Sequence, residues 1–262
     1  IFQVKISTIV QNKYKILSII TLLTLWGLLS NRYSSIIVPD FKDVVRALTS
    51  IFTEKKYQSE IFLTIKRLII ALEISISLGM VLGIICGYSI KIKNFIMPYI
   101  NIMQSVPPIS WLVLALIWFG LNGKASIFIA VISTLPLVMI NIIEGVNNID
   151  KDLVEMGNMY NFSRKKMILK IVVPSIIPYF EAGLKIAVGS ACKIIVMGEV
   201  LSTSSGIGGQ LTNARLNIET EYIFAWTIVI ILLFYITNKI ISYIFDKKIK
   251  GGRYAYKDAK LN

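Results

Sequence analysis

Six long apolar runs alternate with polar segments along the chain, and this pattern predicts a bundle of membrane-spanning helices. A helix of roughly 20 apolar residues is long enough to cross the hydrocarbon core of a bilayer. We therefore expect an all-α, polytopic membrane fold that forms one transmembrane domain over residues 1–262. The runs predicted to form its six or so helices are residues 16–29, 68–90, 95–119, 125–143, 176–197 and 223–245.

The first run admits two interpretations, because Lys5, Lys13 and Lys15 precede it and a basic start before an apolar run is also typical of a signal peptide. No small-x-small cleavage pattern follows Leu29, which favours a spanning or anchoring helix. After this run, a pattern of acidic and apolar residues that begins at Asp40 predicts an amphipathic surface helix.

Glycine and proline mark two of the runs. Gly79, Gly83 and Gly87 recur at every fourth residue and predict a smooth helix face that a neighbouring helix can approach closely. Pro107 and Pro108 remove two backbone donors and break the third run. This break either kinks the helix or exposes backbone to a pathway, and both interpretations stay open at this point.

The longest polar passage lies between the fourth and fifth runs and predicts two short helices joined by an elbow. Asp152, three residues before Glu155, predicts the start of the first helix. Asn161 tolerates the left-handed conformation that ends helices, and Ser163 suits the cap of a second helix. Pro174 is expected to close the passage.

Three cations occupy an unfavourable place in this passage. Arg164, Lys165 and Lys166 fall in the first turn of the second helix, where the helix dipole disfavours positive charge by about 0.3–1 kcal/mol each. Something acidic is therefore expected to face them, either lipid headgroups or a partner protein.

Composition supports a membrane protein with a cytoplasmic polar passage. Hydrophobic residues make up 55% of the chain, and the net charge is +13 without the aromatic and basic interleaving of a nucleic-acid binder. With the amino terminus inside, residues 1–15, 91–94, 145–173 and 246–262 hold 16 lysines and arginines, against 9 in residues 30–67, 120–124 and 198–222. The positive-inside rule thus predicts that both termini are cytoplasmic, with residues 246–262 as a basic tail.

Several kinds of chemistry are excluded. The absence of histidine excludes His-based acid/base and zinc chemistry, and the isolated Cys86 and Cys192 are interpreted as packing residues. The glycines from Gly206 to Gly209 lack the lysine of a phosphate loop, so we expect a tight turn in an outer polar loop. We expect no catalytic, cofactor-binding or metal-binding residue in this chain, and ATP-driven work would need a separate subunit.

Charged residues within the runs are the remaining candidates. A charge at the centre of a span costs roughly 2.5–3.5 kcal/mol on insertion scales, so Glu73, Lys185, Lys193 and Glu199 are candidate interior residues. Alternatively, Lys185 and Glu199 lie near span ends and extend toward the interface. Lys185 can also pair with Glu181, four residues earlier on the same helix face.

The polar passage resembles the cytoplasmic coupling loop of the permease subunits of bacterial ATP-binding-cassette (ABC) importers. The consensus of that loop is Glu-Ala-Ala, three residues, Gly, nine residues, Ile, any residue, Leu and Pro. Here Glu155, Asn161, Ile171, Val173 and Pro174 occupy the Glu, Gly, Ile, Leu and Pro positions with the spacing intact. The resemblance implies a coupling loop over residues 150–174.

Two departures from the consensus concern packing and the elbow. Met156 and Gly157 replace the two alanines, and Asn161 replaces the glycine while keeping its tolerance of the left-handed conformation. The resemblance implies a set of residues that contact the ATPase: Glu155, Met156, Gly157, Asn161, Arg164, Lys165, Ile171 and Pro174.

Further stretches are similar to the subgroup that imports nitrate, sulfonates, bicarbonate or thiamine-type pyrimidines. They are Val38-Pro39-Asp40, residues 104–120 and residues 198–209. The resemblance implies the fold of a type I ABC importer permease in a bacterial inner or plasma membrane. Its implied partners are two ATPase subunits that hold ATP and Mg²⁺, a periplasmic or lipoprotein binding protein, a second permease copy in a homodimer, and membrane lipids.

Alternating access would then carry a small solute along a path between the permeases. We expect polar groups beside the broken third run and in the fourth and fifth runs to line it. These candidates are Gln104, Ser105, Pro107, Pro108, Ser110, Trp111, Asn141, Ser190, Lys193 and Glu199.

Two rival functions come from other classes. A secondary transporter driven by an ion gradient would need inverted repeats and midplane carboxylates, and the chain shows no internal repeat. A membrane-embedded enzyme is disfavoured by the absence of histidine and of clustered carboxylates in the runs.

Overall fold

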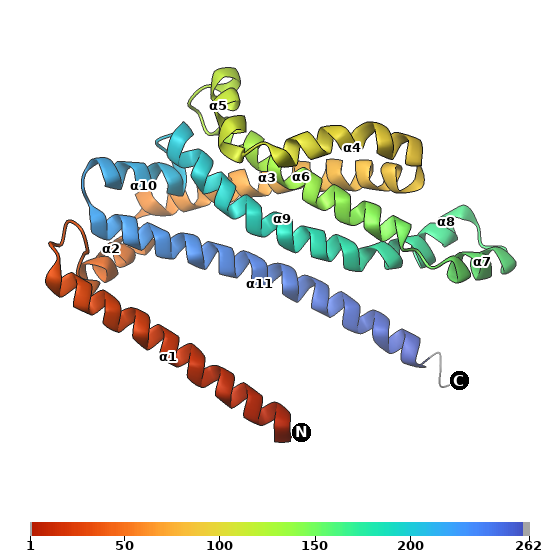
Figure 1. Ribbon diagram of the computed structural model, residues 1–262, viewed down its shortest axis with the longest axis horizontal. Coiled ribbons are helices and arrows are strands. Elements are labelled where there is room, and N and C mark those ends of the chain that lie inside the picture. Colours follow the sequence, from red (N-terminus) through yellow and green to blue (C-terminus); the bar gives the residue numbers. More distant parts are fainter. Residues whose placement is uncertain (1, 259–262) are drawn as a thin grey trace. The chain divides into compact units, whose positions relative to one another are not determined.

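The computed structural model describes the backbone of residues 2–258 and the side chains of Tyr14, Leu17, Ser18 and residues 20–245. All regular elements in this part are helices, which confirms the all-α prediction (Figure 1). They are α1 (Phe2–Arg32), α2 (Phe41–Thr53), α3 (Lys55–Tyr88), α4 (Ile90–Ser105), α5 (Pro108–Phe119), α6 (Lys124–Asn147), α7 (Lys151–Met159), α8 (Arg164–Met167), the π-helical turn η1 (Ile168–Val172), α9 (Val173–Ser202), α10 (Gly206–Leu216) and α11 (Thr220–Asp258).

The chain divides into two compact units. The first comprises Ile1–Gln58 and Leu211–Ile228, and the second comprises Ser59–Gln210 and Val229–Asn262. The prediction of a single transmembrane domain stays a prediction.

In the first unit, α2 is the predicted amphipathic helix. It begins after Asp40, and its apolar face of Val44, Ala47 and Ile51 is buried. Trp26 of α1 donates its indole N–H to the carbonyl oxygen of Pro39 at 3.1 Å. The segment that enters α2 is thereby tied to α1.

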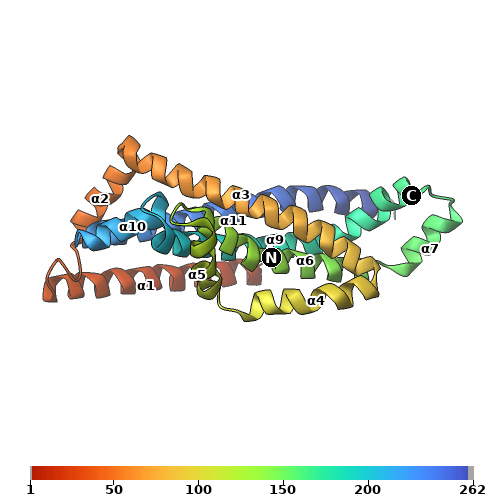
Figure 2. The ribbon, with the colours of Figure 1, turned by 90° about the horizontal axis from the view of Figure 1, so that it is seen from above.

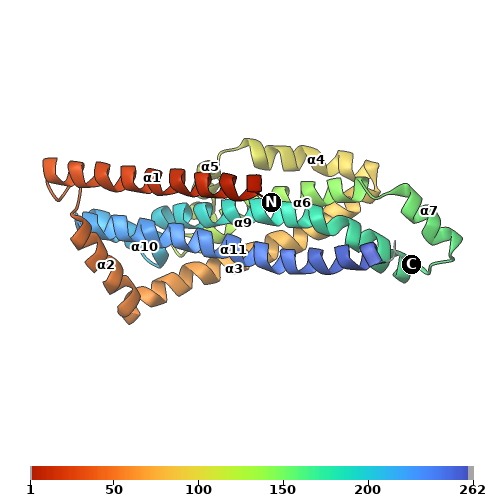
Figure 3. The same ribbon diagram turned by 90° about the horizontal axis from the view of Figure 1, so that it is seen from below.

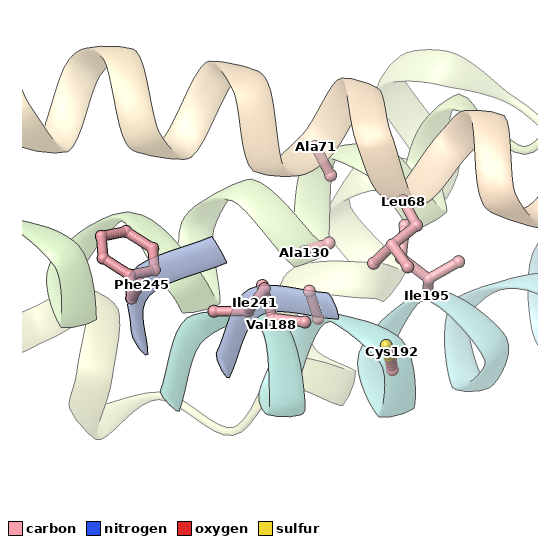
Figure 4. Close-up of a cluster of buried hydrophobic side chains, with 9 residues drawn as sticks. Leu68, Ala71, Ala130, Val188, Cys192, Ile195, Ile241 and Phe245 are labelled. Atoms are coloured by element: carbon pink, nitrogen blue, oxygen red, sulfur yellow. The ribbon is translucent and has the colours of Figure 1, made fainter. Parts of the chain in front are cut away.

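The second unit is built around α3, α6 and α9, with the later part of α11 beside them. Figure 4 shows side chains from all four helices meeting in one apolar cluster, which includes Leu68, Ala130, Ile195 and Phe245. In a bilayer such helices are held together by van der Waals packing of these side chains, because lipid tails are as apolar as the side chains themselves.

The glycine stripe of α3 packs as predicted. A Cβ atom at Gly83 would lie 2.7 Å from the Cβ of Ile142 on α6, and Gly79 and Gly87 meet Val138 and Val146 in the same way. Only glycine allows the two backbones to come this close.

The helix pair α4 and α5 confirms the break at Pro107 and Pro108. The two helices are bent by 97° at that point, and Figure 2 shows α5 turning away from the direction of α4. Among residues with described side chains, α3, α6 and α11 are long and apolar enough to span a membrane, and α4 with α5 adds a fourth as a broken span.

Two of the six predicted runs are not among these spans. The run at residues 16–29 lies in α1, several of whose side chains are outside the described part. The run at residues 176–197 lies in α9, which is long but carries Glu181, Lys185, Lys193 and Glu199.

Several predicted boundaries were wrong. Helix α3 begins at Lys55, well before residue 68, and the segment at residues 198–222, predicted to be an outer loop, contains α10, which begins at Gly206 with a φ of +84°. Helix α11 continues to Asp258, so the predicted tail at residues 246–262 begins as helix. The side chains of 246–258 and all of 259–262 lie outside the described residues.

Candidate functional site

The polar passage folds into two short helices joined by an elbow beyond the start of α9 (Figures 1 and 2). Helix α7 begins at Lys151, and the carboxylate of Asp150 caps it by accepting the Asp152 N–H at 2.9 Å. The prediction that Asp152 caps this helix was therefore wrong. Asp150 precedes it and holds the extended conformation of an N-cap, while Asp152 and Glu155 lie within the helix.

The elbow itself is confirmed at Asn161. Its φ is +49°, and the next N–H, of Phe162, donates to the carbonyl oxygen of Gly157 at 2.9 Å. This bond closes the end of α7 in the manner of a left-handed C-terminal cap. Ser163 then caps α8 by accepting the Lys166 N–H at 3.4 Å.

Gly157 lets the two arms of the elbow touch. It is buried, and a Cβ atom there would lie 2.8 Å from the Met167 Cε and 2.9 Å from the Ile171 Cδ1. Ile171 is itself only 5% exposed. Of the residues expected to contact an ATPase, these two therefore hold the loop together from within.

Pro174 does not close the passage as predicted. Helix α8 continues through the π-helical turn Ile168–Val172 into α9, and Pro174 is the second residue of α9. A proline inside a helix removes one hydrogen bond, and a π turn is one way in which a helix adapts locally. The second arm is therefore joined to α9 without an intervening loop.

The outer surface of the passage is apolar on α7 and basic on α8. Leu153 is 40% exposed, Met156 is 42% exposed and Met159 is 83% exposed, and Glu155 lies exposed among them. Arg164 and Lys165 are also exposed. The ion pairs found in the described part of the chain join other residues, namely Arg46 with Asp43, Arg67 with Glu199, and Lys185 with Glu181. Arg164 and Lys165 therefore have no acidic partner among the described residues.

A sealed polar cluster lies at the other end of α9. The carboxylate of Glu199 is fully buried and accepts from the Arg67 guanidinium at 2.7 Å, from the Thr64 hydroxyl at 2.9 Å and from the Gly208 N–H at 3.0 Å. Buried charges are stable only when paired and hydrogen-bonded in this way. The cluster fastens α3 to the start of α10.

The glycine-rich segment completes this cluster with backbone groups. Arg67 also donates to the carbonyl oxygen of Ser205 at 3.1 Å, and the Gly206 N–H donates to Glu60. Thr64 accepts the Ile207 N–H at 2.8 Å. Gly206 and Gly208 therefore act as close backbone donors to carboxylates and not as a phosphate loop.

The sequence alone did not single out Arg67, Thr64 or Glu60. Arg67 was assigned to an outer segment because it precedes the apolar run. The sequence signal that could have indicated this pair is the position of Arg67 and Glu199, each at the end of an apolar run. Lys185 does pair with Glu181 at 2.6 Å, as expected from their spacing.

The expected path residues are spread over α4, α5, α6 and α9. Gln104, Ser105 and Ser110 are exposed around the bend, where Pro107 caps α5 and Pro108 begins it. Trp111 follows in α5 with its indole N–H buried and without a hydrogen-bond partner in the described structure.

On α6 and α9 the candidates differ in exposure. Asn141 donates to the carbonyl oxygen of Leu137 at 2.8 Å and packs against Gly183. Ser190 is half-buried and Lys193 is exposed, with its Nζ 5.8 Å from the centre of the Phe234 ring. Glu199 faces protein, so it does not extend toward an interface.

The comparison with protein families decides the assignment. Residues 79–251, more than half of the chain, match the family described as binding-protein-dependent transport system inner membrane component. The chain belongs to this family of permeases. The residues matched contain both the elbow passage and the Glu199 end of α9.

Two relatives of this permease carry names that refer to aliphatic sulfonates and to nitrate. It is 22% identical over 223 residues to the protein of Bacillus subtilis that is named "Putative aliphatic sulfonates transport permease protein SsuC", covering 85% of this chain and 80% of the relative. It is 32% identical over 156 residues to the nitrate import permease NrtB of Synechococcus elongatus, covering 60% of this chain and 56% of the relative.

Solved structures support the fold of the permease. A crystal structure of an amino acid ABC transporter with histidines has a TM-score of 0.56 at 17% identity, covering 79% of this chain and 96% of that one. The MetNI methionine ABC transporter in inward-facing conformations has a TM-score of 0.53 at 16% identity, covering 79% and 95%.

These findings confirm an ABC importer permease of the sulfonate and nitrate subgroup. The chain is therefore a multi-pass inner-membrane transport subunit and not an enzyme. Its family implies ATPase and binding-protein partners. A secondary transporter driven by an ion gradient is disfavoured accordingly.

Proposed function

We propose that residues 150–174 of this permease are the cytoplasmic surface on which an ATPase subunit acts, and that both termini are cytoplasmic. The observation that supports this most is the rigid elbow at Asn161, whose second arm is continuous with α9. An ATPase that moved the elbow would move α9 with it, because no flexible loop separates them. Glu155, Met156, Gly157, Arg164, Lys165, Ile171 and Pro174 complete this surface or hold its shape.

The remaining partners follow from the same proposal. Two ATPase subunits supply ATP and Mg²⁺, a second copy of this permease forms the other wall of the path, and an external binding protein delivers the solute. The solute is a sulfonate, nitrate, bicarbonate or thiamine-type pyrimidine, and the exposed Lys193 favours the anions among these.

The first test is purification of the full chain from its own membranes. An ATPase subunit is expected to come away with it, and reconstituted transport should require that subunit. Solute uptake that ran without an ATPase would overturn the proposal.

The second test separates coupling from assembly. Glu155→Arg reverses an exposed charge beside the exposed apolar residues of α7, and Asn161→Pro removes the left-handed elbow because proline requires a negative φ. Complexes that contain either variant should stay assembled and should hydrolyse ATP through their ATPase subunits without solute uptake. Glu144→Arg, on α6 before the passage, is the matched control and should transport normally. Normal uptake in both elbow variants would contradict the proposal.

Uptake competition identifies the solute class. Sulfonates, nitrate, bicarbonate and a neutral pyrimidine are offered in turn to the complete transporter with its binding protein. Mass spectrometry of the solute retained by that binding protein gives an independent answer.

A further inference from the structure

An apolar cavity of about 540 Å³ lies beside the elbow, between the end of α3 and the start of α9. Its walls include Met80, Ile84 and Tyr88 of α3 and Ile177 and Phe180 of α9. This volume lies in the range of pockets that hold small molecules, about 300–1,000 Å³. The ATPase contact proposed above does not account for it.

The cavity has a mouth at the polar passage and a deep end among the apolar runs. Gly87 of α3 packs on Val146 at the end of α6 that leads into α7, so Tyr88 marks the end of the cavity near the elbow. Met80 lies eight residues earlier, about 12 Å deeper along the helix. The deep part is therefore lined by residues of the apolar runs, and the mouth lies at the polar passage.

The mouth is basic. Arg164 lines it, and no acidic residue belongs to the lining. Lys166 holds its Nζ 4.0 Å from the centre of the ring of Phe162, which is also part of the lining. Arg164 and Lys166 stand in the first turn of α8, where the helix dipole disfavours cations. An anion at the mouth would relieve this repulsion.

We infer that this cavity binds one anionic phospholipid, with an acyl chain among Met80, Ile84 and Phe180 and the phosphate at Arg164. Apolar depth with a basic mouth fits such a molecule, because its charge and its hydrocarbon lie at opposite ends. The inference rests on the proposed function in one respect: the cytoplasmic leaflet, where anionic lipids attract basic segments, borders the elbow.

The test uses the full chain, with the subunits that purify with it, in vesicles of phosphatidylcholine and phosphatidylglycerol. A phosphatidylglycerol with a photoactivatable group on its acyl chain is cross-linked, and the labelled peptides are identified by mass spectrometry. Label is expected on α3 and α9 around Ile84 and Ile177. The matching phosphatidylcholine probe should label these peptides about fivefold less, which corresponds to about 1 kcal/mol for one basic residue.

Two pairs of variants separate the acyl chain from the headgroup. Ile84→Trp fills the cavity and should abolish labelling by both probes, whereas Ile85→Trp, at the neighbouring exposed position outside the lining, should not. Arg164→Gln should remove the fivefold preference and keep the basal labelling. Lys170→Gln, an exposed cation outside the lining, is its control.

Three outcomes would overturn the inference. Equal labelling by the two probes would remove the anionic preference, and equal effects of Ile84→Trp and Ile85→Trp would remove the cavity. A phosphatidylglycerol preference that Arg164→Gln left unchanged would remove this cation as the headgroup contact. The absence of an ATPase subunit from every preparation would overturn the proposed function, and the labelling result would stand apart from it.

Discussion

The two ends of α9 differ in whether the charged side chains around them are buried and paired. At Glu199 the carboxylate and the Arg67 guanidinium are buried and paired with each other, and the backbone of the glycine-rich segment supplies further donors. At Arg164 the cations are exposed without acidic partners among the described residues, and a cavity opens beside them. Figure 3 shows α9 running between these regions, alongside α6.

This difference indicates which end is rigid and which end binds something. A satisfied buried network resists rearrangement because opening it would leave charges unpaired in a low dielectric. Unpaired cations and exposed apolar side chains are instead typical of a surface that meets a partner. The Glu199 end of α9 is thus held by contacts within its own chain, while the Arg164 end presents a surface suited to binding other molecules.

The largest effect is expected from Arg67→Met. It leaves the Glu199 carboxylate buried without its cation, and breaking a buried pair in this way costs about 3–5 kcal/mol. Unfolding in detergent would measure the loss. The double variant Arg67→Met with Glu199→Gln should recover part of it, because the glutamine carries no charge.

Arg46→Met is the matched control for this substitution. Arg46 pairs with Asp43 at 3.1 Å with 79% of its side chain exposed, and an exposed pair contributes about 0–1 kcal/mol. Equal losses at Arg67 and Arg46 would show that the buried cluster is not the anchor.

Glycine replacement compares the two ends directly. A Cβ atom at Gly208 would lie 2.5 Å from the carbonyl oxygen of Val196, whereas at Gly157 it would meet the flexible end of Met167. Gly208→Ala should therefore cost about 1–3 kcal/mol through overpacking, and Gly157→Ala distinctly less, since Met167 can move. Thermal unfolding of both variants in one detergent checks the order. A reversed order would mean that the elbow is the tighter end.

The elbow conformation is tested at Asn161. Its φ of +49° should disfavour Asn161→Val by about 1–2 kcal/mol, because a β-branched residue rarely adopts the left-handed region. Asn161→Gly is the control and should be neutral or slightly stabilising. Hydrogen exchange of α7 and α8 amides reports the effect, and equal protection in both variants would argue against a strained elbow.

Ser163→Ala should have the smallest effect. The cap that it removes is long, at 3.4 Å, and the loss of an N-cap costs about 0.5–2 kcal/mol, so we expect the lower end of this range. The change should appear as faster exchange at the Lys166 amide without altered global unfolding. If Ser163→Ala lowered the global stability as much as Arg67→Met does, the two ends of α9 would be equally important to the fold, and the comparison would fail.

The order and type of most elements could be predicted from local pattern alone. Apolar runs, the double proline and the glycine stripe each act through a few neighbouring residues, so four of the spans, the break at Pro107 and the close approach at Gly83 could be predicted. The elbow at Asn161 was predictable for the same reason, since few residue types tolerate a positive φ.

What the sequence by itself determined is therefore this set of local features, together with the family motif from Glu155 to Pro174. The tertiary structure alone decided that Arg67 meets Glu199, which lies 132 residues later, that α10 forms where a loop was expected, and that a cavity opens at Arg164. Pairings at such separation depend on how whole helices pack, and periodicity along the chain carries no information about them.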